Sequence, residues 1–305
     1  MTTAAPTSRI RRRNAAAAIA PYLFVGAAAI YLLFFMVVPM ARGLWFSFTD
    51  ATLLNPDGGQ FVGGKNYGDL LTSGAFYSSL LTTLLYTAGT VIGSLLFGTV
   101  AAVALSERIR GRAVFRALLT IPWAVPSVAA VLVFIWIFNV ESGVANRATK
   151  ALGIGAQGWL LDPKLGLLSV TLVSVWKVFP FVMLVVLAAL QGVPGELREA
   201  ARVDGADRLN VFRTVTLPHI VPTLRIVALL MTIWSIRRFE VIYLLTGGGP
   251  IDTTNTIVIS VYREAFQNSQ LGQAAAIGML GLCLSMVVTV VYFLSDRSDA
   301  RKDAR

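Results

Sequence analysis

Six apolar runs, each long enough to cross a lipid bilayer as a helix, constrain this chain of 305 residues more than any other feature. A membrane helix needs about 20 mostly apolar residues, because each residue advances about 1.5 Å along the axis. Hydrophobic residues make up 56% of the chain and charged residues 14%, against about 25% charged in soluble domains. The sequence therefore predicts an all-α integral membrane protein with six transmembrane helices. The expected spans cover approximately residues 15–40, 80–105, 113–138, 165–190, 223–245 and 272–294.

The distribution of Lys and Arg predicts how these spans are oriented. The two tails, the connector 106–116 and the polar segment 194–218 carry four basic residues each, whereas the three opposite loops share six. By the positive-inside rule, both tails and the segment 194–218 are predicted to be cytoplasmic. The predicted organisation is a cytoplasmic basic tail over 1–14, a six-helix transmembrane domain over 15–295 and a second cytoplasmic basic tail over 296–305.

Several broad classes of protein do not fit the composition. The net charge of +10 is not gathered on a recognisable nucleic-acid motif, so no nucleic-acid partner is expected. Cys283 is the single cysteine, so the fold cannot depend on an intramolecular disulfide. The first apolar run is longer than the core of a signal peptide, and it is therefore expected to be retained as a membrane helix.

The polar segment 194–218 lies between two apolar runs and is predicted to form two short helices outside the membrane. Pro194 and Gly195 precede the first helix, and the Asp204-Gly205 pair offers a turn at its end. Asp207 can cap the second helix, which is expected to end at Pro218. Small side chains on the first helix allow another surface to approach closely, and a bulky aromatic on the second can fill a partner's pocket.

This segment resembles the cytoplasmic coupling loop of permease subunits from bacterial ATP-binding cassette importers. The family's pattern is EAA, three residues, then G, and it closes nine residues later on I-x-LP, where this chain has Val215, Leu217 and Pro218. The stretches FVGGKNYGDLL, IPWAVP, VWKVFPFVMLVVLAALQ and TGGGP also resemble the carbohydrate branch, on the MalF or glycerol-phosphate side. The residues that the resemblance assigns to ATPase coupling are Glu199, Ala200, Ala201, Asp204, Gly205, Phe212 and Pro218.

The resemblance covers nearly all of the chain and implies the type I importer permease fold in a bacterial inner membrane. It implies one permease half that imports a carbohydrate or related polyol together with a second, similar permease subunit. Two cytoplasmic ATPase subunits would hold ATP and Mg, and an extracytoplasmic solute-binding protein would deliver the solute. No catalytic residue, metal or cofactor is therefore expected on this chain itself, and its lipid contacts are those of a membrane protein.

Four charged residues within the predicted spans are candidates for the substrate pathway: Lys177, Arg237, Arg238 and Glu240. A charge at the centre of a membrane helix costs about 2.5 to 3.5 kcal/mol on insertion scales, so these side chains are expected to face the bundle interior. Arg237 and Glu240, at i and i+3, could pair on one helix face, which leaves open whether they are structural or contact substrate. Arg238 leaves open an alternative solute with anionic character, such as an anionic sugar or a polyol phosphate.

Three prolines lie inside predicted spans and mark candidate kinks or gates. Pro122 and Pro126 fall in the third span and Pro180 in the fourth, and each removes one backbone donor from its helix. A plain kink and a gate are equally compatible with this pattern.

The same sequence argues against nucleotide binding, ion-coupled transport and catalysis by this chain. Gly59, Gly64 and Lys65 have the spacing of a phosphate-binding loop, but Asn66 stands where a hydroxyl is required, and neither a strand nor a helix is expected there. The GxGxxG pattern over 153–158 likewise lacks a βαβ context. An ion-coupled secondary transporter would show inverted repeats and several intramembrane acids, and a membrane enzyme would need a catalytic constellation that the lone His219 does not supply.

Overall fold

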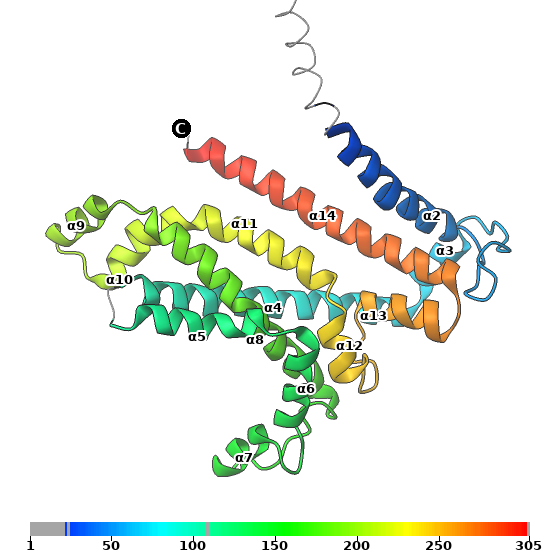
Figure 1. Cartoon of the computed structure of the whole chain (residues 1–305), viewed down its shortest axis with the longest axis horizontal. Helices are drawn as coiled ribbons and strands as arrows, with labels where there is room; N and C mark the ends of the chain where they lie inside the picture. Colours follow the sequence, from blue (N-terminus) through cyan, green and yellow to red (C-terminus); the bar gives the residue numbers. More distant parts are fainter. Residues whose placement is uncertain (1–21, 23–24, 108–109, 304–305) are drawn as a thin grey trace, which may run out of the picture.

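The computed structural model describes residue 22, residues 25–107 and residues 110–303, with side chains up to Leu294. Five helices in this part of the chain are long and apolar enough to span a membrane, and a sixth candidate is a helix pair bent by 96°. Helices cover most of the described part of each of the six apolar runs, which confirms the all-α prediction (Figure 1). In chain order the helices after the first described turns are η1 (Leu33–Val37), α2 (Val38–Phe46), α3 (Lys65–Thr72), α4 (Gly74–Ser106), α5 (Arg112–Ala124), α6 (Ser127–Ile137), α7 (Val144–Ala151), α8 (Pro163–Gln191), α9 (Gly195–Val203), α10 (Arg208–Val211), η2 (Phe212–Thr216), α11 (Leu217–Ile236), α12 (Glu240–Thr246), α13 (Ile257–Tyr262), η3 (Arg263–Gln267) and α14 (Leu271–Asp303).

The first and last helices extend beyond the expected spans. The first span is described over Val25–Phe46, so it ends later than expected, and the predicted tail 1–14 lies outside the described residues. The last helix, α14, runs to Asp303, so its backbone continues as a helix through residues 296–303 of the predicted tail. No cap residue or proline interrupts the sequence there, which is why the helix can continue.

Close contact between α4 and α8 forms the centre of the bundle, and this pair contacts more extensively than any other two elements. A Cβ added at Gly89 would lie 2.9 Å from Cγ2 of Thr171, and one at Gly93 would lie 2.7 Å from Cγ2 of Val175. A Cβ at Gly98 would meet Cβ of Val182 at 2.6 Å. Gly89 and Gly93 have the GxxxG spacing that favours close helix contact in membranes, and here it marks such a contact, because only glycine lets the two backbones approach this closely.

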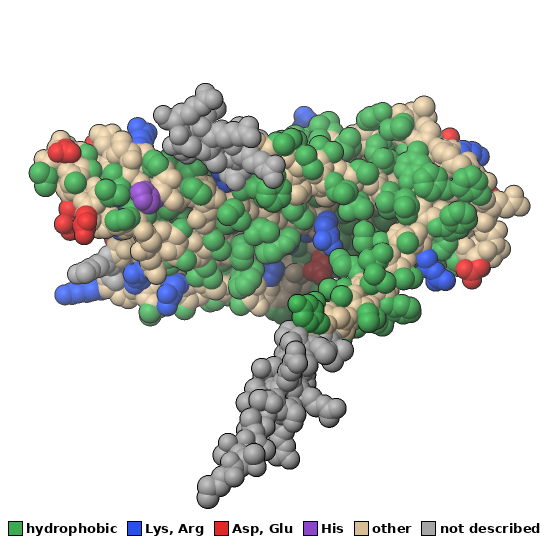
Figure 2. All heavy atoms as spheres, turned by 90° about the horizontal axis from the view of Figure 1, so that it is seen from above, with side chains coloured by type: hydrophobic (Ala, Val, Ile, Leu, Met, Phe, Trp, Pro, Cys, Tyr) green, Lys and Arg blue, Asp and Glu red, His purple; other side chains and the backbone are tan. Residues whose placement is uncertain are grey.

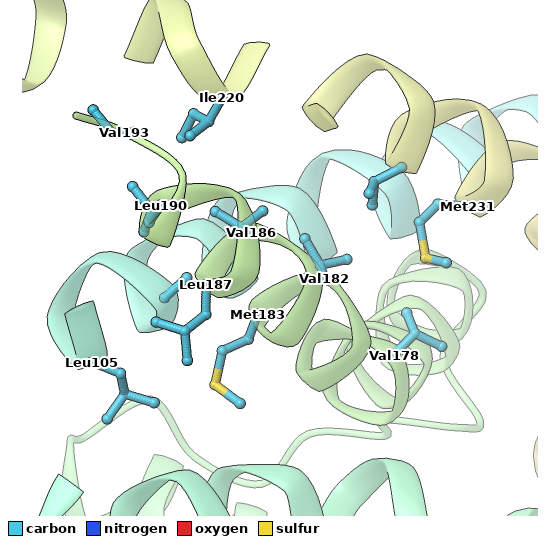
Figure 3. Packing of buried hydrophobic residues seen from close by; sticks show 12 residues of the cluster. Leu105, Val178, Val182, Met183, Val186, Leu187, Leu190, Val193, Ile220 and Met231 are labelled. Carbon is cyan, nitrogen blue, oxygen red and sulfur yellow. The ribbon is translucent and has the colours of Figure 1, made fainter. Parts of the chain in front are cut away.

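Two apolar cores lie along this pair of helices. The first surrounds the half of α8 that leads to α9, where Val182, Val186 and Leu190 pack against Ile220 and Met231 of α11 (Figure 3). The second surrounds the other half of α8 and is built from α4, α6, α8, α12 and α13. α8 therefore runs through the middle of the molecule, where it contacts α4, α5, α6, α11 and α12.

Two of the predicted spans are interrupted. The third consists of α5 and α6, which meet at 96° around Val125 and Pro126, so the prolines break the helix rather than kink it slightly. The fifth was expected to continue to Leu245, but α11 ends at Ile236 and α12 begins at Glu240. By contrast, α8 continues without a break through Pro180.

The prediction that the second short helix ends at Pro218 is wrong. α10, η2 and α11 form one helix from Arg208 to Ile236. In the wide turn η2 the backbone N–H of Leu217 bonds to the carbonyl of Phe212, five residues earlier. This change in bonding pattern immediately before Pro218 lets the helix pass a residue that has no N–H to donate.

We expect Gly98→Ala to destabilise the bundle by about 1 to 3 kcal/mol, because the added methyl would overlap Val182 and the carbonyl of Phe179. The measurement is thermal aggregation of the purified protein in detergent. Gly74→Ala is the matched control in the same helix, since a Cβ there has nothing within 4 Å. Equal melting of the two variants would contradict the close contact between α4 and α8.

Candidate functional site

The segment 194–218 contains α9 and the first turns of the long helix that begins with α10, and both project from one end of the bundle (Figure 1). α9 ends in a left-handed turn at Gly205, whose φ is +88°, and the Gly205 N–H bonds to the carbonyl of Arg202 at 3.1 Å. The carboxylate of Asp207 then accepts a hydrogen bond of 2.7 Å from the N–H of Asn210 and caps α10. The turn at Gly205 and the cap at Asp207 are as the sequence predicts.

The residues assigned to coupling are not all on one surface. Glu199, Ala200, Asp204 and Gly205 are exposed on α9 and its turn, and Ala201 is half-buried. Phe212 is half-buried in η2 against the rest of the chain, and exposed Pro218 lies in the first turn of α11. The exposed apolar residues at this end are Leu197, Val203 and Leu209, of which Val203 is 87% exposed.

Arg198 ties α9 to the end of α8, a contact that the sequence analysis missed. Its Nη2 donates a hydrogen bond of 2.9 Å to the carbonyl of Val193, and Val193 is itself buried in the first apolar core. Because only Gly192, Val193 and Pro194 separate the two helices, this contact holds α9 close to the end of α8. No sequence motif predicts this contact, because Arg198 lies in a polar helix where an arginine would be expected to be exposed to solvent.

Lys177 and the prolines of the third span, separate in sequence, meet inside the bundle. Pro126 has no N–H, so the carbonyl of Pro122, four residues before it, has no helical donor. The Lys177 ammonium donates to that carbonyl at 3.2 Å and also to the carbonyl of Val125. Lys177 is 7% exposed, which agrees with the expectation that it faces the interior.

The interruption between α11 and α12 separates the other charged candidates. Arg237 is exposed and lines an apolar groove of about 630 Å³ between α11, α13 and α14. Arg238 turns inward instead, where it interacts electrostatically with Tyr86 and Lys177, and its Nε is buried without a hydrogen-bond partner among the described residues. Glu240 is exposed and starts α12, and it too interacts with Lys177.

The expected pair between Arg237 and Glu240 is absent from the part of the chain that the structure describes. The two residues would be one turn apart on a continuous helix, but the helix stops at Ile236 and restarts at Glu240. Figure 2 shows basic and acidic side chains together in a recess near the middle of a largely hydrophobic face.

An aromatic cluster lies beside the α11–α12 interruption and was not recognised in the sequence. The ring centroids of Phe239 and Tyr243 are 4.9 Å apart and stacked, and those of Tyr243 and Tyr262 are 4.7 Å apart. Phe266, 59% exposed, extends the cluster from Tyr262 at 5.1 Å. The four residues come from α12, α13, η3 and the interruption itself, so only the fold brings them together.

The TGGGP loop after α12 is held by Arg263 and packs against the far end of α8. Arg263 donates to the carboxylate of Asp252 at 2.5 Å and to the carbonyl of Gly247 at 2.8 Å. A Cβ added at Gly166 of α8 would lie 3.2 Å from Cδ of Pro250. This loop is therefore fixed to the end of α8 opposite α9.

The glycine patterns do not form nucleotide sites in the structure. A short helix, α3, does begin at Lys65, contrary to the sequence expectation, but no strand precedes it within the described residues. Residues 154–158 form an irregular loop after α7. The described residues also contain no group of three or more His, Cys, Asp or Glu side chains placed to hold a metal.

A bundle of membrane-spanning helices with an exposed two-helix segment at one end is the architecture of a transport-system membrane component. The model of the family described as "Binding-protein-dependent transport system inner membrane component" matches residues 94–302, and the chain belongs to this family. The family is one of transporters rather than enzymes, so the alternative of a membrane enzyme is set aside.

Relatives match over most of both chains. The trehalose/maltose transport system permease protein MalF of Thermococcus litoralis is 32% identical over 94% of this chain and 95% of its own length. The sulfoquinovosyl glycerol transport system permease protein SmoG of Agrobacterium fabrum is 33% identical over 88% of each chain. The multiple sugar-binding transport system permease protein MsmF of Streptococcus mutans is 32% identical over 84% of this chain and 88% of its own.

Solved structures share the fold. A chain from a bacterial transporter involved in import of the acidic polysaccharide alginate matches with a TM-score of 0.82 over 95% of this chain and 99% of its own, at 21% identity. A second structure of a bacterial alginate transporter, in complex with an alginate pentasaccharide-bound periplasmic protein, gives a TM-score of 0.79 at 22% identity, over 92% of this chain and 94% of its own. The type I importer permease fold expected from the sequence is thereby confirmed.

We expect Gly205→Val to be more damaging than Gly205→Asn, because β-branched residues resist a φ of +88° whereas Asn tolerates it. The valine variant should lose most ATP-dependent uptake while its amount in the membrane stays normal. Uptake and membrane content are measured together for both variants. Equal uptake by the two variants would contradict a requirement for this turn.

Proposed function

We propose that this chain is one permease half of an ATP-driven importer for a carbohydrate or a related polyol. The observation that carries the proposal is the exposed α9–α10 segment, which connects α8 to α11 and projects beyond the bundle. Force applied to such a segment would reach two membrane helices directly. Support for the solute class comes from relatives that are named for trehalose and maltose, for sulfoquinovosyl glycerol and for multiple sugars.

The energy would come from ATPases on separate subunits. The exposed face around Glu199, Ala200 and Gly205 offers small side chains and polar groups to a docking surface, and the exposed Leu209 adds apolar area. Phe212 and Pro218 support this face from η2 and α11. Two such ATPases, one for each permease half, would bind ATP and Mg and pull on the coupling segments as they close.

A second, similar permease subunit would complete the membrane part of the complex. The helix over Val25–Phe46 has none of its most apolar stretch buried within this chain, and Phe34, Phe35 and Met36 are each more than 60% exposed. Lipid and a partner's helices are the two surroundings that suit such a helix. An extracytoplasmic binding protein would deliver the solute to the end of the bundle formed by α3, α13 and the TGGGP loop.

The proposed orientation places the coupling segment and both termini in the cytoplasm. The support is the excess of Lys and Arg on these segments over the opposite loops. Arg208 of α10 also lies 3.8 Å from Glu107 in the α4–α5 connector, so two of the basic segments are neighbours in the fold.

The solute pathway would pass the interruption between α11 and α12. Arg238 and Glu240 offer hydrogen-bonding groups, and the Phe239, Tyr243 and Tyr262 rings offer apolar surface beside them. Ligand sites typically combine a small number of polar groups with a lining of aromatic and apolar side chains. Pro122 and Pro126 would form the pathway's bend, whereas Pro180 lies within a continuous helix and has no such role.

An anionic carbohydrate is a second candidate solute. The buried Nε of Arg238 has no hydrogen-bond partner among the described residues. A guanidinium with a free donor suits a carboxylate or phosphate group.

The test of the proposal is reconstitution of the chain with its partner permease, the ATPases and the binding protein in proteoliposomes. Uptake of the cognate sugar should require ATP and should persist when ion gradients are collapsed. Uptake that stops when the ion gradient is collapsed and does not depend on ATP would contradict the proposal.

We expect Arg238→Ala to raise the KM for transport by less than about tenfold for a neutral solute, and by roughly ten- to a hundredfold for an anionic one. The difference follows because an anionic group adds charge attraction to the hydrogen bond, which then contributes about 1.5 to 3 kcal/mol, whereas a neutral hydroxyl accepts the hydrogen bond alone. The neighbouring Arg237→Ala, in the apolar groove, is the control and should leave KM within about twofold. An unchanged KM in Arg238→Ala would place Arg238 outside the pathway.

A further inference from the structure

Lys177 is a candidate for the substrate pathway from the sequence, but its ammonium is already engaged by backbone carbonyls at the α5–α6 break. The carbonyls of Pro122 and Val125 accept its hydrogen bonds, and the side chain is buried. The carbonyl of Pro122 depends on such a donor, because Pro126 cannot supply a backbone N–H. The ammonium therefore stabilises the 96° bend at Val125 and Pro126, which is called the α5–α6 corner below.

Residues on either side of Lys177 hold both arms of this corner against α8. Trp176 packs edge-on against Phe134 of α6, with ring centroids 5.0 Å apart. Phe181, one turn further along, contacts Trp123 of α5 at 5.9 Å and Trp234 of α11 at 5.1 Å. The corner is thus attached to the middle of α8 by an ammonium and two aromatic contacts.

α8 connects this corner to the coupling segment, and α6 connects it to the pathway. α9 follows α8 after three residues, and Arg198 holds it to the carbonyl of Val193. α6 packs on α12, which begins at Glu240, the residue that also interacts with Lys177. A displacement of α9 would therefore travel along α8 to the corner, and from the corner through α6 to α12.

We propose that Lys177 is a positioning residue of the transport cycle, which fixes the α5–α6 corner to α8 so that movement of the coupling segment reaches α12. The inference rests on the proposed function, because it requires an ATPase that moves α9. It differs from a substrate contact, which would change KM, and from a purely structural role, which would change only assembly.

The test compares Lys177→Met, which keeps length and apolar bulk but has no donor, with Lys177→Arg, which keeps the charge and the donors. Each is assembled with the partner permease and the ATPases in lipid nanodiscs for ATP hydrolysis, and in proteoliposomes for uptake. We expect Lys177→Met to retain basal ATP hydrolysis and the KM for solute. The amount of solute moved per ATP should fall by about tenfold, within the usual range for coupling between sites. Lys177→Arg should recover at least half of the lost coupling.

Lys164→Met is the matched control, since Lys164 is exposed in the first turn of the same helix. It should leave the ratio of solute to ATP unchanged. Spin labels at the exposed positions Val114 of α5 and Leu132 of α6 report the corner directly. On ATP binding, the distance between the two labels should shift from one narrow distribution to another in wild type. In Lys177→Met the distribution of this distance should be broad.

Three results would overturn the inference. Unchanged coupling in Lys177→Met would show that the ammonium transmits nothing, and a raised KM with normal coupling would make it a substrate contact. Failure of both Lys177 variants to assemble would give it a folding role alone. A wild-type complex without solute-stimulated ATP hydrolysis would instead contradict the proposed function, and the inference with it.

Discussion

The close approach of α4 to α8 is the contact on which the rest of the structure depends. Lipid chains are as apolar as leucine, so membrane helices associate mainly through packing, and packing is best where side chains are small. Gly89, Gly93 and Gly98 allow α8 to lie directly against α4, with Thr171, Val175 and Val182 in the spaces. α5, α6, α11 and α12 all pack against α8 as a shared central helix.

The two interruptions in the spans are stabilised in different ways. Irregular backbone inside a membrane is tolerated where it is buried in protein or lines a watery cavity. At the α5–α6 corner the prolines leave carbonyls without donors, and Lys177 supplies them. Between α11 and α12 no proline is present, and three charged residues and an aromatic cluster surround the gap instead. At the first interruption the free carbonyls are thus hydrogen-bonded within the chain, whereas at the second Glu240 is exposed and the buried Nε of Arg238 has no hydrogen-bond partner among the described residues.

Hydropathy alone predicts the six membrane-crossing segments, and local turn chemistry predicts the left-handed turn at Gly205 and the cap at Asp207. The GxxxG spacing also predicts a close helix contact, although not its partner. The sequence does not reveal that the fifth span stops at Ile236, because no proline or glycine marks that point. It also does not reveal that Lys177 bonds to the carbonyls of Pro122 and Val125, or that Phe239 meets Tyr262. These contacts join residues distant in sequence, so they depend on how the helices pack.

Lys177 is the central residue of α8, a helix about 43 Å long at 1.5 Å per residue. If the helix is anchored at that residue, it behaves as a rigid lever with a fulcrum halfway along, and its two ends swing by equal amounts in opposite directions. One end of α8 leads into α9, and its other end packs at Gly166 against Pro250 of the TGGGP loop. A displacement of α9 would then move the other end of α8 in the opposite direction. The bundle would open at one end as it narrows at the other, and this movement would not depend on contact with the solute.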